Sequence, residues 1–260
     1  MLRGVNRPVQ LLPLAALFAL PIFLVGAAES VAPETPSGGD AVIAEHVALL
    51  HGLGRSARAM RPLEGPLSDG GYHVHNLDYP STEQAPEELV AYLAEEVDRC
   101  CADAQRLHFV THSMGGILLR AYAAEHPNPA LGRVVMLAPP NRGSEYVDVA
   151  GDWALFEIFL GPTAQQLGTD PESLPNRLPA PDFELGVIAG TGGINLIGDM
   201  MIDGENDGTV SVESTRIPGM RDFIIVDASH TFIMRDDDVA RQTLAFLRSG
   251  AFERERSSSR

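Results

Sequence analysis

Short apolar runs alternate along this chain with longer segments in which apolar residues recur at helical spacing. The runs predict six strands, at residues 47–52, 72–80, 106–113, 133–140, 183–190 and 221–228. The amphipathic segments predict four helices, at residues 54–71, 86–104, 114–127 and 237–250. Strands that alternate with helices in this way indicate an α/β domain with a doubly wound, mostly parallel sheet.

The first residues have the features of a targeting segment. Arg3 and Arg7 precede an apolar run over residues 11–28, which ends in small residues suited to cleavage. Pro13 and Pro21 would weaken a straight membrane-spanning helix. We therefore expect a secreted or periplasmic protein after signal cleavage, with anchoring to the cytoplasmic membrane through residues 11–28 as the alternative.

These patterns divide the chain into four parts. We expect a signal peptide or N-terminal membrane anchor, then a linker rich in Pro, Gly and Ser, then one α/β domain and a polar tail. Their boundaries are residues 1–28, 29–41, 42–250 and 251–260.

Charge narrows the range of partners. The formal net charge is −16 and all 19 basic residues are arginine. A basic surface, which nucleic-acid binding needs, is therefore not expected. The absence of lysine from the sequence also excludes Schiff-base chemistry on a lysine amine.

Two residue pairs invite a structural or metal-binding interpretation. Cys100 and Cys101 are adjacent on a predicted helix, where their Cβ atoms diverge, so we expect them to pack as small apolar side chains without a disulfide. His73 and His75 are two apart on a predicted strand and could share a face, as a metal pair would. No third ligand is evident, so no metal site is predicted.

Ser113 lies between a predicted strand and a predicted helix, followed by Met114, Gly115 and Gly116. A nucleophilic serine needs such a sharp turn, which lifts its Oγ clear of the backbone. The G-x-S-x-G pattern is met except at its first position, which is Thr111. A serine that only caps the helix is the alternative.

The loop "HGLGR" follows the first predicted strand, at residues 51–55. Its glycines allow backbone N–H groups to converge on an anion, as the tetrahedral intermediate of acyl transfer requires. The backbone N–H groups of Leu53 and Met114 are the expected donors; a glycine-rich turn with no ligand is the alternative.

A serine hydroxyl needs a base, and the base needs a carboxylate that orients it. His230 follows the last predicted strand, and Asp207 lies in the turn-rich stretch "ENDGTV" after the preceding one. The order Ser113, Asp207, His230 is the one that a serine-hydrolase α/β sheet requires. Asp203, Asp199 and, less readily, Asp170 remain alternatives for the carboxylate.

With these motifs in place, the chain resembles the α/β-hydrolase superfamily, specifically bacterial serine lipases and esterases. The resemblance rests on "HGLGR", "THSMGG", "NDGTV" and "SHTF", in that order along residues 47–247. It implies a Ser–His–Asp triad, an oxyanion hole of two backbone N–H groups, and no metal or organic cofactor. Thr111 departs from the usual glycine of the motif.

The stretch at 141–182 stands outside the core pattern, at a place where this superfamily commonly carries an inserted cap or lid. It contains the chain's single tryptophan, Trp153, with Phe156 and Phe159 at helical spacing. We expect these three side chains to help line an acyl pocket; packing on the sheet is the alternative.

The predicted activity is that of a serine ester hydrolase, a lipase or carboxylesterase that forms an acyl-enzyme on Ser113. The apolar candidate lid favours a small-molecule or lipid ester with a lipidic or medium-chain acyl group. An acyltransferase or thioesterase with the same triad is one alternative, because sequence does not show which acceptor takes the acyl group. A non-catalytic binding protein with this fold is another.

Overall fold

The computed structural model describes residues 45–150, 161–193 and 202–254. The chain divides into two units, Met1–Ala41 and Val42–Arg260, and all the described residues lie in the second. None of the helices in these described ranges is long and apolar enough to cross a bilayer.

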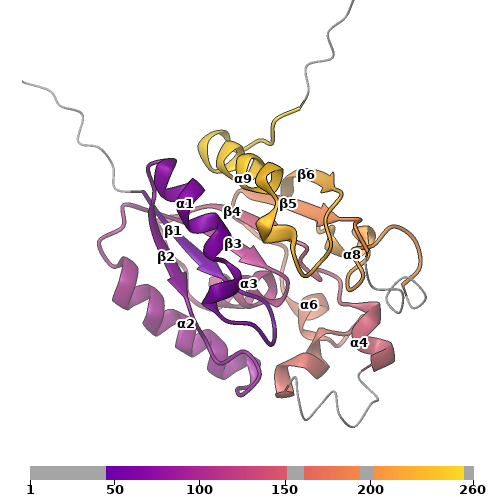
Figure 1. Cartoon of the computed structure of the whole chain (residues 1–260). Coiled ribbons are helices and arrows are strands. Elements are labelled where there is room, and N and C mark those ends of the chain that lie inside the picture. Colours follow the sequence, from indigo (N-terminus) through magenta and orange to yellow (C-terminus); the bar gives the residue numbers. More distant parts are fainter. Residues whose placement is uncertain (1–44, 151–160, 194–201, 255–260) are drawn as a thin grey trace, which may run out of the picture. The chain divides into compact units, whose positions relative to one another are not determined.

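A parallel sheet forms the centre of the described part (Figure 1). Within the described residues it has six strands, in the order β2-β1-β3-β4-β5-β6. Every neighbouring pair is parallel, with Leu50 beside Thr111 at the carboxyl ends of β1 and β3. The strands are β1 Glu45–Leu50, β2 His73–Leu77, β3 Arg106–His112, β4 Leu131–Leu137, β5 Leu185–Gly190 and β6 Met220–Val226. The predicted α/β fold with a mostly parallel sheet is therefore confirmed.

Helices connect the strands, as a parallel sheet requires. The α-helices are α1 Arg61–Asp69, α2 Pro86–Cys101, α3 Met114–Glu125, α4 Glu145–Ala150, α6 Leu174–Arg177, α8 Val212–Thr215 and α9 Asp237–Ser249. Short 3₁₀ turns occur at Ala57–Ala59, Gln165–Leu167 and Ile233–Arg235. The four helices predicted from the sequence correspond to α1, α2, α3 and α9.

Alternate residues of each strand enter two separate apolar layers. On β1, Ala48 and Leu50 pack with α2 and α3, whereas Val47 and Leu49 pack with α1 and α9. This two-sided burial follows from the alternation of side chains across a strand. It also explains why β1, β4 and β5 contain continuous apolar runs instead of alternating with polar residues.

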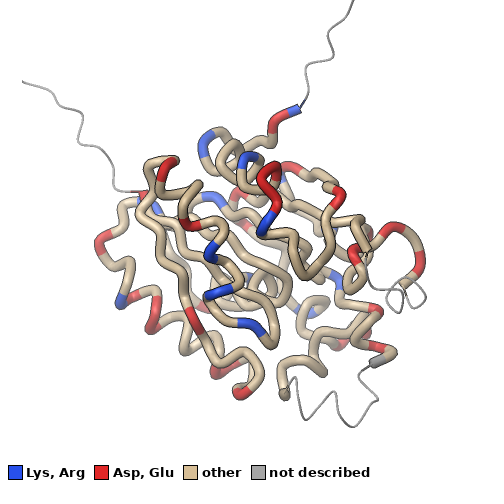
Figure 2. The backbone as a smooth tube through the Cα atoms, in the orientation of Figure 1, with Lys and Arg blue, Asp and Glu red and all other residues tan. Residues whose placement is uncertain are grey.

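Acidic side chains lie at the starts of two long helices. Glu87 and Glu88 lie in the first turn of α2, and Asp237 and Asp238 lie in the first turn of α9 (Figure 2). Carboxylates there complement the positive end of the helix dipole. Gly250, in left-handed backbone with φ of 73°, ends α9 where the sequence predicts a stop.

The expectation that Cys100 and Cys101 are not bonded to each other is wrong. The two residues end α2 and form a disulfide across adjacent positions. The diverging Cβ directions do not prevent this, because each sulfur extends one bond beyond its Cβ. Cys101 is nonetheless buried, and belongs to the apolar layer between the sheet and α2.

Candidate active site

Ser113 stands at a strained turn between β3 and α3. Its backbone φ of 53° and ψ of −126° lie in a region that non-glycine residues rarely occupy. Such conformations cost about 1–3 kcal/mol and persist where surrounding contacts impose them. One such contact is the hydrogen bond from the Ser113 backbone N–H to the Leu137 carbonyl, at 2.9 Å. The turn places Ser113 at the N-terminus of α3, as the sequence predicts.

Glycines allow α3 to pack against the sheet at this turn. A Cβ on Gly115 would lie 2.7 Å from the His51 carbonyl oxygen, so only glycine fits without a backbone shift. A Cβ on Gly116 would lie 3.2 Å from the Thr111 Oγ1. Gly116 thus leaves room for the Thr111 side chain, which stands where the G-x-S-x-G motif has its first glycine.

The structure brings Ser113, His230 and Asp207 together. His230 Nε2 lies 3.0 Å from Ser113 Oγ, and His230 Nδ1 lies 2.8 Å from Asp207 Oδ2. Asp207 is 2% exposed and His230 is 8% exposed, so bulk water is largely excluded from the second bond. A carboxylate that accepts Nδ1–H leaves the Nε2 lone pair free to receive the serine proton.

The turn around Asp207 holds its carboxylate in place. Asp207 Oδ1 accepts the backbone N–H groups of Thr209 at 3.0 Å and Val210 at 2.8 Å. Asn206 Oδ1 accepts the N–H of Gly208, which has φ of 91°. The sequence "NDG" forms this turn because Asn and Asp side chains bond to nearby backbone and glycine adopts positive φ. The second carboxylate oxygen is left facing His230.

Two of the three alternative carboxylates lie in the described part of the chain, and neither occupies this position. Asp203 and Asp170 are exposed. Asp199 lies outside the described residues, as do Trp153, Phe156 and Phe159 of the expected acyl pocket.

His112 adds a link between β3 and the loop that carries His230. Its Nε2–H donates to the His230 carbonyl oxygen at 2.9 Å, and the two rings lie 4.9 Å apart. Burial lowers the pKa of His112 well below its usual value, and the neighbouring His230 lowers it further. His112 is therefore neutral beside the base and holds it without adding a competing positive charge.

The loop after β1 and the first residue of α3 each present a free backbone N–H group. Within the described ranges, the backbone N–H groups of Leu53 and Met114 have no hydrogen-bond partner. The next residue, Gly54, instead donates to Ser81 Oγ at 3.1 Å, and His51 stacks on Tyr79 with ring centroids 4.0 Å apart. These contacts fix the loop while leaving two donors available to an anion.

A cavity of about 170 Å³ opens beside Ser113 and His230. Besides the expected Leu53, its apolar lining includes Pro140, Tyr146, Val147, Leu167 and Val210. These five residues were not predicted from the sequence. Three of them, Tyr146, Val147 and Leu167, lie within the candidate lid range 141–182, but the path of that segment over the sheet could not be predicted from periodicity.

Arg120 ties α3 to the segment that supplies this lining. Its guanidinium is buried and donates to the carbonyl oxygens of Asn141, Pro175, Leu178 and Pro179, at 3.1–3.3 Å. Burial lowers the pKa of Arg120 to about 10, so it keeps its charge at neutral pH. The inserted segment is therefore anchored near both ends of its described part.

Comparison with solved structures finds the same fold in a lipase, a carboxyl esterase and a phospholipase. Bacillus licheniformis lipase BlEst2 in mature form is 20% identical, with 80% of this chain and 93% of that chain covered and a TM-score of 0.64. The metagenomic carboxyl esterase MGS0156 is 18% identical, with 87% and 80% covered and a TM-score of 0.60. Phospholipase PlaB from Legionella pneumophila, in complex with thio-NAD, is 17% identical, with 78% and 55% covered and a TM-score of 0.60.

Identities this low support a shared fold and nothing finer. A search of curated protein sequences finds no significant match. A family model described as the alpha/beta hydrolase family matches residues 47–243. Because that match covers well over half of the 260 residues, this chain belongs to the alpha/beta hydrolase family.

Proposed function

We propose that this protein is a serine ester hydrolase in which Ser113 is the nucleophile. The observation that carries the proposal is the continuous hydrogen-bonded chain from Ser113 Oγ through His230 to Asp207, with distances of 3.0 and 2.8 Å. The strained turn at Ser113 and the two free backbone donors beside it supply the other parts that acyl transfer needs.

In the first half of the reaction, Ser113 Oγ attacks the ester carbonyl carbon while His230 Nε2 takes the hydroxyl proton. The carbonyl oxygen becomes an oxyanion, which the N–H groups of Leu53 and Met114 stabilise. His230 then gives its proton to the leaving alcohol oxygen, the carbon–oxygen bond breaks, and an acyl-enzyme remains on Ser113.

In the second half, a water molecule attacks the acyl-enzyme. His230 takes one proton from the water, a second tetrahedral intermediate forms at the same donors, and the carboxylic acid leaves as Ser113 Oγ recovers a proton from His230. Asp207 stabilises the positive imidazole in both halves and remains ionised throughout.

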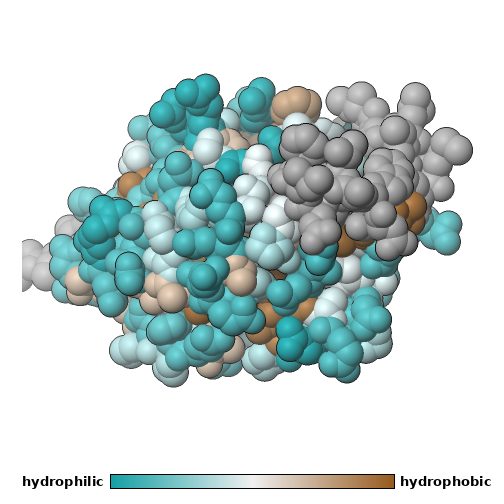
Figure 3. All heavy atoms as spheres, turned by 90° about the horizontal axis from the view of Figure 1, so that it is seen from below, coloured by the Kyte–Doolittle hydropathy of each residue, from teal (hydrophilic) through white to brown (hydrophobic). Residues whose placement is uncertain are grey.

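The substrate class follows from the surroundings of Ser113. The cavity surface is more apolar than polar, with Arg55 as the one arginine among its described lining residues. Two large hydrophobic residues close to it in sequence are exposed: Val149 (47%), two residues after Val147 of the wall, and Phe232 (45%), two residues after His230. On the face seen from below, the described surface is mainly hydrophilic, and its hydrophobic areas are small and separate (Figure 3). The apolar part of the cavity and the exposed Val149 and Phe232 support a substrate with a lipidic or medium-length acyl chain. The names of the lipase, phospholipase and esterase neighbours suggest the same class.

A fluorophosphonate probe tests the nucleophile directly. We expect the wild-type protein to be labelled at Ser113, Ser113→Ala to remain unlabelled, and Ser249→Ala, which removes a hydroxyl at the end of α9, to label normally. A folded wild-type protein that is inert to the probe and to esters would instead be a non-catalytic member of the family.

A panel of p-nitrophenyl esters of increasing chain length tests the substrate class. We expect kcat/KM to be highest for medium or longer acyl chains, and its response to an oil–water interface to distinguish a lipase from an esterase. A maximum at acetate, unchanged by the interface, would contradict the lipidic assignment without affecting the triad.

We also propose that residues 1–28 direct export and are removed. N-terminal sequencing of the protein from culture supernatant, periplasm and membrane fractions tests this. A mature start near residue 29 supports cleavage, whereas an intact N-terminus in the membrane fraction supports the anchor.

A further inference from the structure

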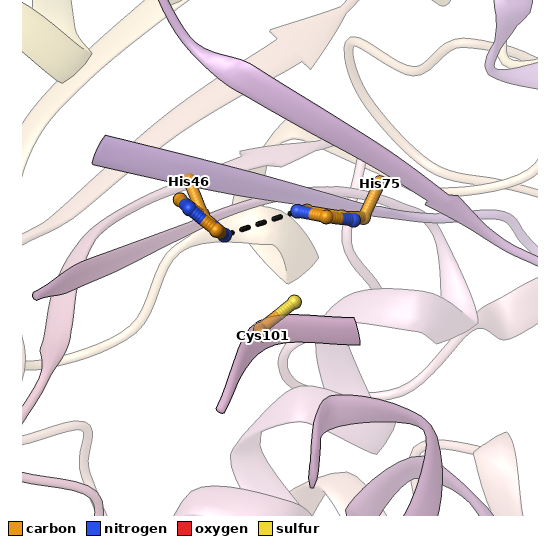
Figure 4. Close-up of side chains that lie close together, drawn as sticks. All are labelled: His46, His75 and Cys101. Atoms are coloured by element: carbon orange, nitrogen blue, oxygen red, sulfur yellow. Dashed lines mark hydrogen bonds between the residues drawn. The ribbon is translucent and has the colours of Figure 1, made fainter. Parts of the chain in front are cut away.

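Three side chains with metal-binding atoms meet at the amino-terminal end of the sheet, away from Ser113. His46 is the second residue of β1, His75 lies on the neighbouring strand β2, and Cys101 is the last residue of α2. Figure 4 shows the two imidazoles directed at each other and the Cys101 sulfur pointing toward the gap between them. The nucleophile, in contrast, follows the carboxyl end of β3.

The geometry of this group is close to that of a ligand set. His75 Nε2 lies 3.1 Å from His46 Nδ1. One ring nitrogen of each histidine and Cys101 Sγ all lie within 4.8 Å of one another. Around tetrahedral zinc, two nitrogens are separated by about 3.3 Å and a nitrogen and a sulfur by about 3.6 Å, from bond lengths near 2.05 and 2.3 Å. The facing nitrogens are thus nearly at the spacing that zinc needs, and the distance from nitrogen to sulfur exceeds that spacing by at most about 1 Å.

The environment also suits a bound ion. His46 and Cys101 are each 6% exposed, and His75 is partly buried, so water does not compete freely for the site. The two facing nitrogens share a single proton, since one must donate and the other accept. A cation that accepts both lone pairs can replace that proton, which moves to the far nitrogen of its own ring.

We propose that His46, His75 and Cys101 bind one Zn²⁺ ion when the disulfide between Cys100 and Cys101 is reduced. A water molecule occupies the fourth position. Imidazole nitrogen and thiolate sulfur are the ligands that zinc prefers. From the sequence, His73 and His75 were the candidate metal pair and no third ligand was evident. In the structure His75 instead faces His46, and Cys101 of α2 supplies the third ligand atom.

Reduction is the step that makes the thiolate available. With a phosphine as reductant, the disulfide, one phosphine and one water give two thiols and one phosphine oxide. Zinc then binds the Cys101 sulfur and displaces its proton to solvent. In the oxidised chain Cys101 Sγ is bonded to Cys100 Sγ, so the site has only its two imidazoles.

The ion would connect β1, the neighbouring strand β2 and the end of α2. Because it lies at the opposite end of the strands from Ser113, its contribution is to stability and not to ester hydrolysis. The inference therefore does not depend on the proposed function, and either can fail while the other stands.

Two matched serine variants test the proposal in the full chain. Cys100→Ser and Cys101→Ser both abolish the disulfide, but only Cys100→Ser keeps the ligand sulfur. Without any reductant, we expect Cys100→Ser to bind one Zn²⁺ per chain in a competition titration against a chromophoric chelator. Cys101→Ser should bind zinc more weakly by more than the roughly 10–100-fold that loss of an outer-sphere partner costs.

Further arms confirm the ligands. Wild-type protein should bind zinc after phosphine treatment and not before, and Co²⁺ should give a thiolate-to-metal charge-transfer band in Cys100→Ser but not in Cys101→Ser. In the Cys100→Ser background, His75→Gln should weaken binding, whereas His126→Ala, which removes an exposed histidine on α3's C-terminal side, should not. Equal zinc affinity of the two cysteine variants, or no stoichiometric binding by folded Cys100→Ser, would overturn the proposal.

Discussion

Replacing Asp207 by asparagine is a sharp perturbation of the site, because it changes one hydrogen-bond direction and almost no volume. Asp207 Oδ1 accepts two backbone N–H groups, from Thr209 and Val210. In Asp207→Asn, the amide oxygen must keep that position, since an NH₂ group there would face two donors. The amide NH₂ is then directed at His230 Nδ1.

That arrangement reverses the imidazole. A donor facing Nδ1 requires a lone pair on Nδ1, so the proton of neutral His230 moves to Nε2, 3.0 Å from Ser113 Oγ. The ring can no longer accept the serine proton. Loss of the correct tautomer costs about 10⁴ in kcat in a serine protease triad. At 1.36 kcal/mol for each factor of ten, this corresponds to about 5.5 kcal/mol of transition-state stabilisation.

The assay is steady-state hydrolysis of a p-nitrophenyl ester, with kcat and KM determined separately. We expect kcat to fall about 10⁴-fold with little change in KM, because the cavity is untouched. Nitrogen-15 NMR of labelled histidine should show the His230 proton on Nδ1 in wild type and on Nε2 in the variant. Asp203→Asn, the same substitution at an exposed position four residues earlier, should leave kcat and the position of the His230 proton as they are.

Two results would contradict this role of Asp207. Folded Asp207→Asn could keep kcat within tenfold of wild type, or it could lose activity while the imidazole proton stays on Nδ1. The first outcome would remove the carboxylate from the mechanism. The second would assign the loss to displacement of the loop and not to the tautomer.

Other predictions concern the scaffold; urea denaturation measures their effects on stability, and ester hydrolysis measures kcat/KM. Gly115→Ala should destabilise the protein by about 1–3 kcal/mol and lower kcat/KM, because its Cβ would meet a backbone carbonyl oxygen at 2.7 Å. Gly65→Ala, which has open space around its Cβ, should instead stabilise the protein by roughly 0.5–1 kcal/mol. Burial lowers the pKa of His108 from 6.5 to about 4. Between pH 6.5 and 4 the unfolded chain therefore binds a proton that the folded chain does not, and the free energy of unfolding should fall by up to about 3 kcal/mol. His108→Gln should reduce this dependence of the free energy of unfolding on pH. Arg120→Met should destabilise the protein by about 2–4 kcal/mol, because buried carbonyl oxygens lose their donor.

Much of the fold was predictable because its determinants are local. The six strands and four main helices follow from apolar periodicity and from turn residues, with shifts of a few residues at their ends. For example, β2 ends at Leu77 although the alternating pattern continues to Pro80. The next residue, Asp78, instead accepts a hydrogen bond from the backbone N–H of Ala57. Such boundaries depend on partners distant in the sequence.

The positions of Ser113, Asp207 and His230 were readable for a similar reason. Each follows a strand whose carboxyl end can be located, and parallel strands bring these ends to one edge of the sheet. The cavity residues Tyr146 and Leu167 were not readable, since they belong to an insertion whose path is set by tertiary contacts.

The cysteine and histidine pairs show another limit of pattern. That His46 faces His75 depends on the register of β1 against β2, in which His46 pairs with His73 and Ala48 with His75. Periodicity places residues on a face but does not fix which residues of two strands become neighbours. The disulfide between Cys100 and Cys101 was likewise not predicted, because the Cβ directions do not show where the sulfur atoms lie.

All four hydrogen-bonding groups of His230 are engaged. Its ring nitrogens bond Ser113 and Asp207, its backbone N–H donates to the Asp207 carbonyl oxygen at 3.0 Å, and its own carbonyl oxygen accepts from His112. The imidazole, which is the general base of the proposed mechanism, is thus held in place when the chain folds and needs no ordering step during turnover. An Arrhenius plot of ester hydrolysis should accordingly stay straight from low temperature until the chain itself begins to melt.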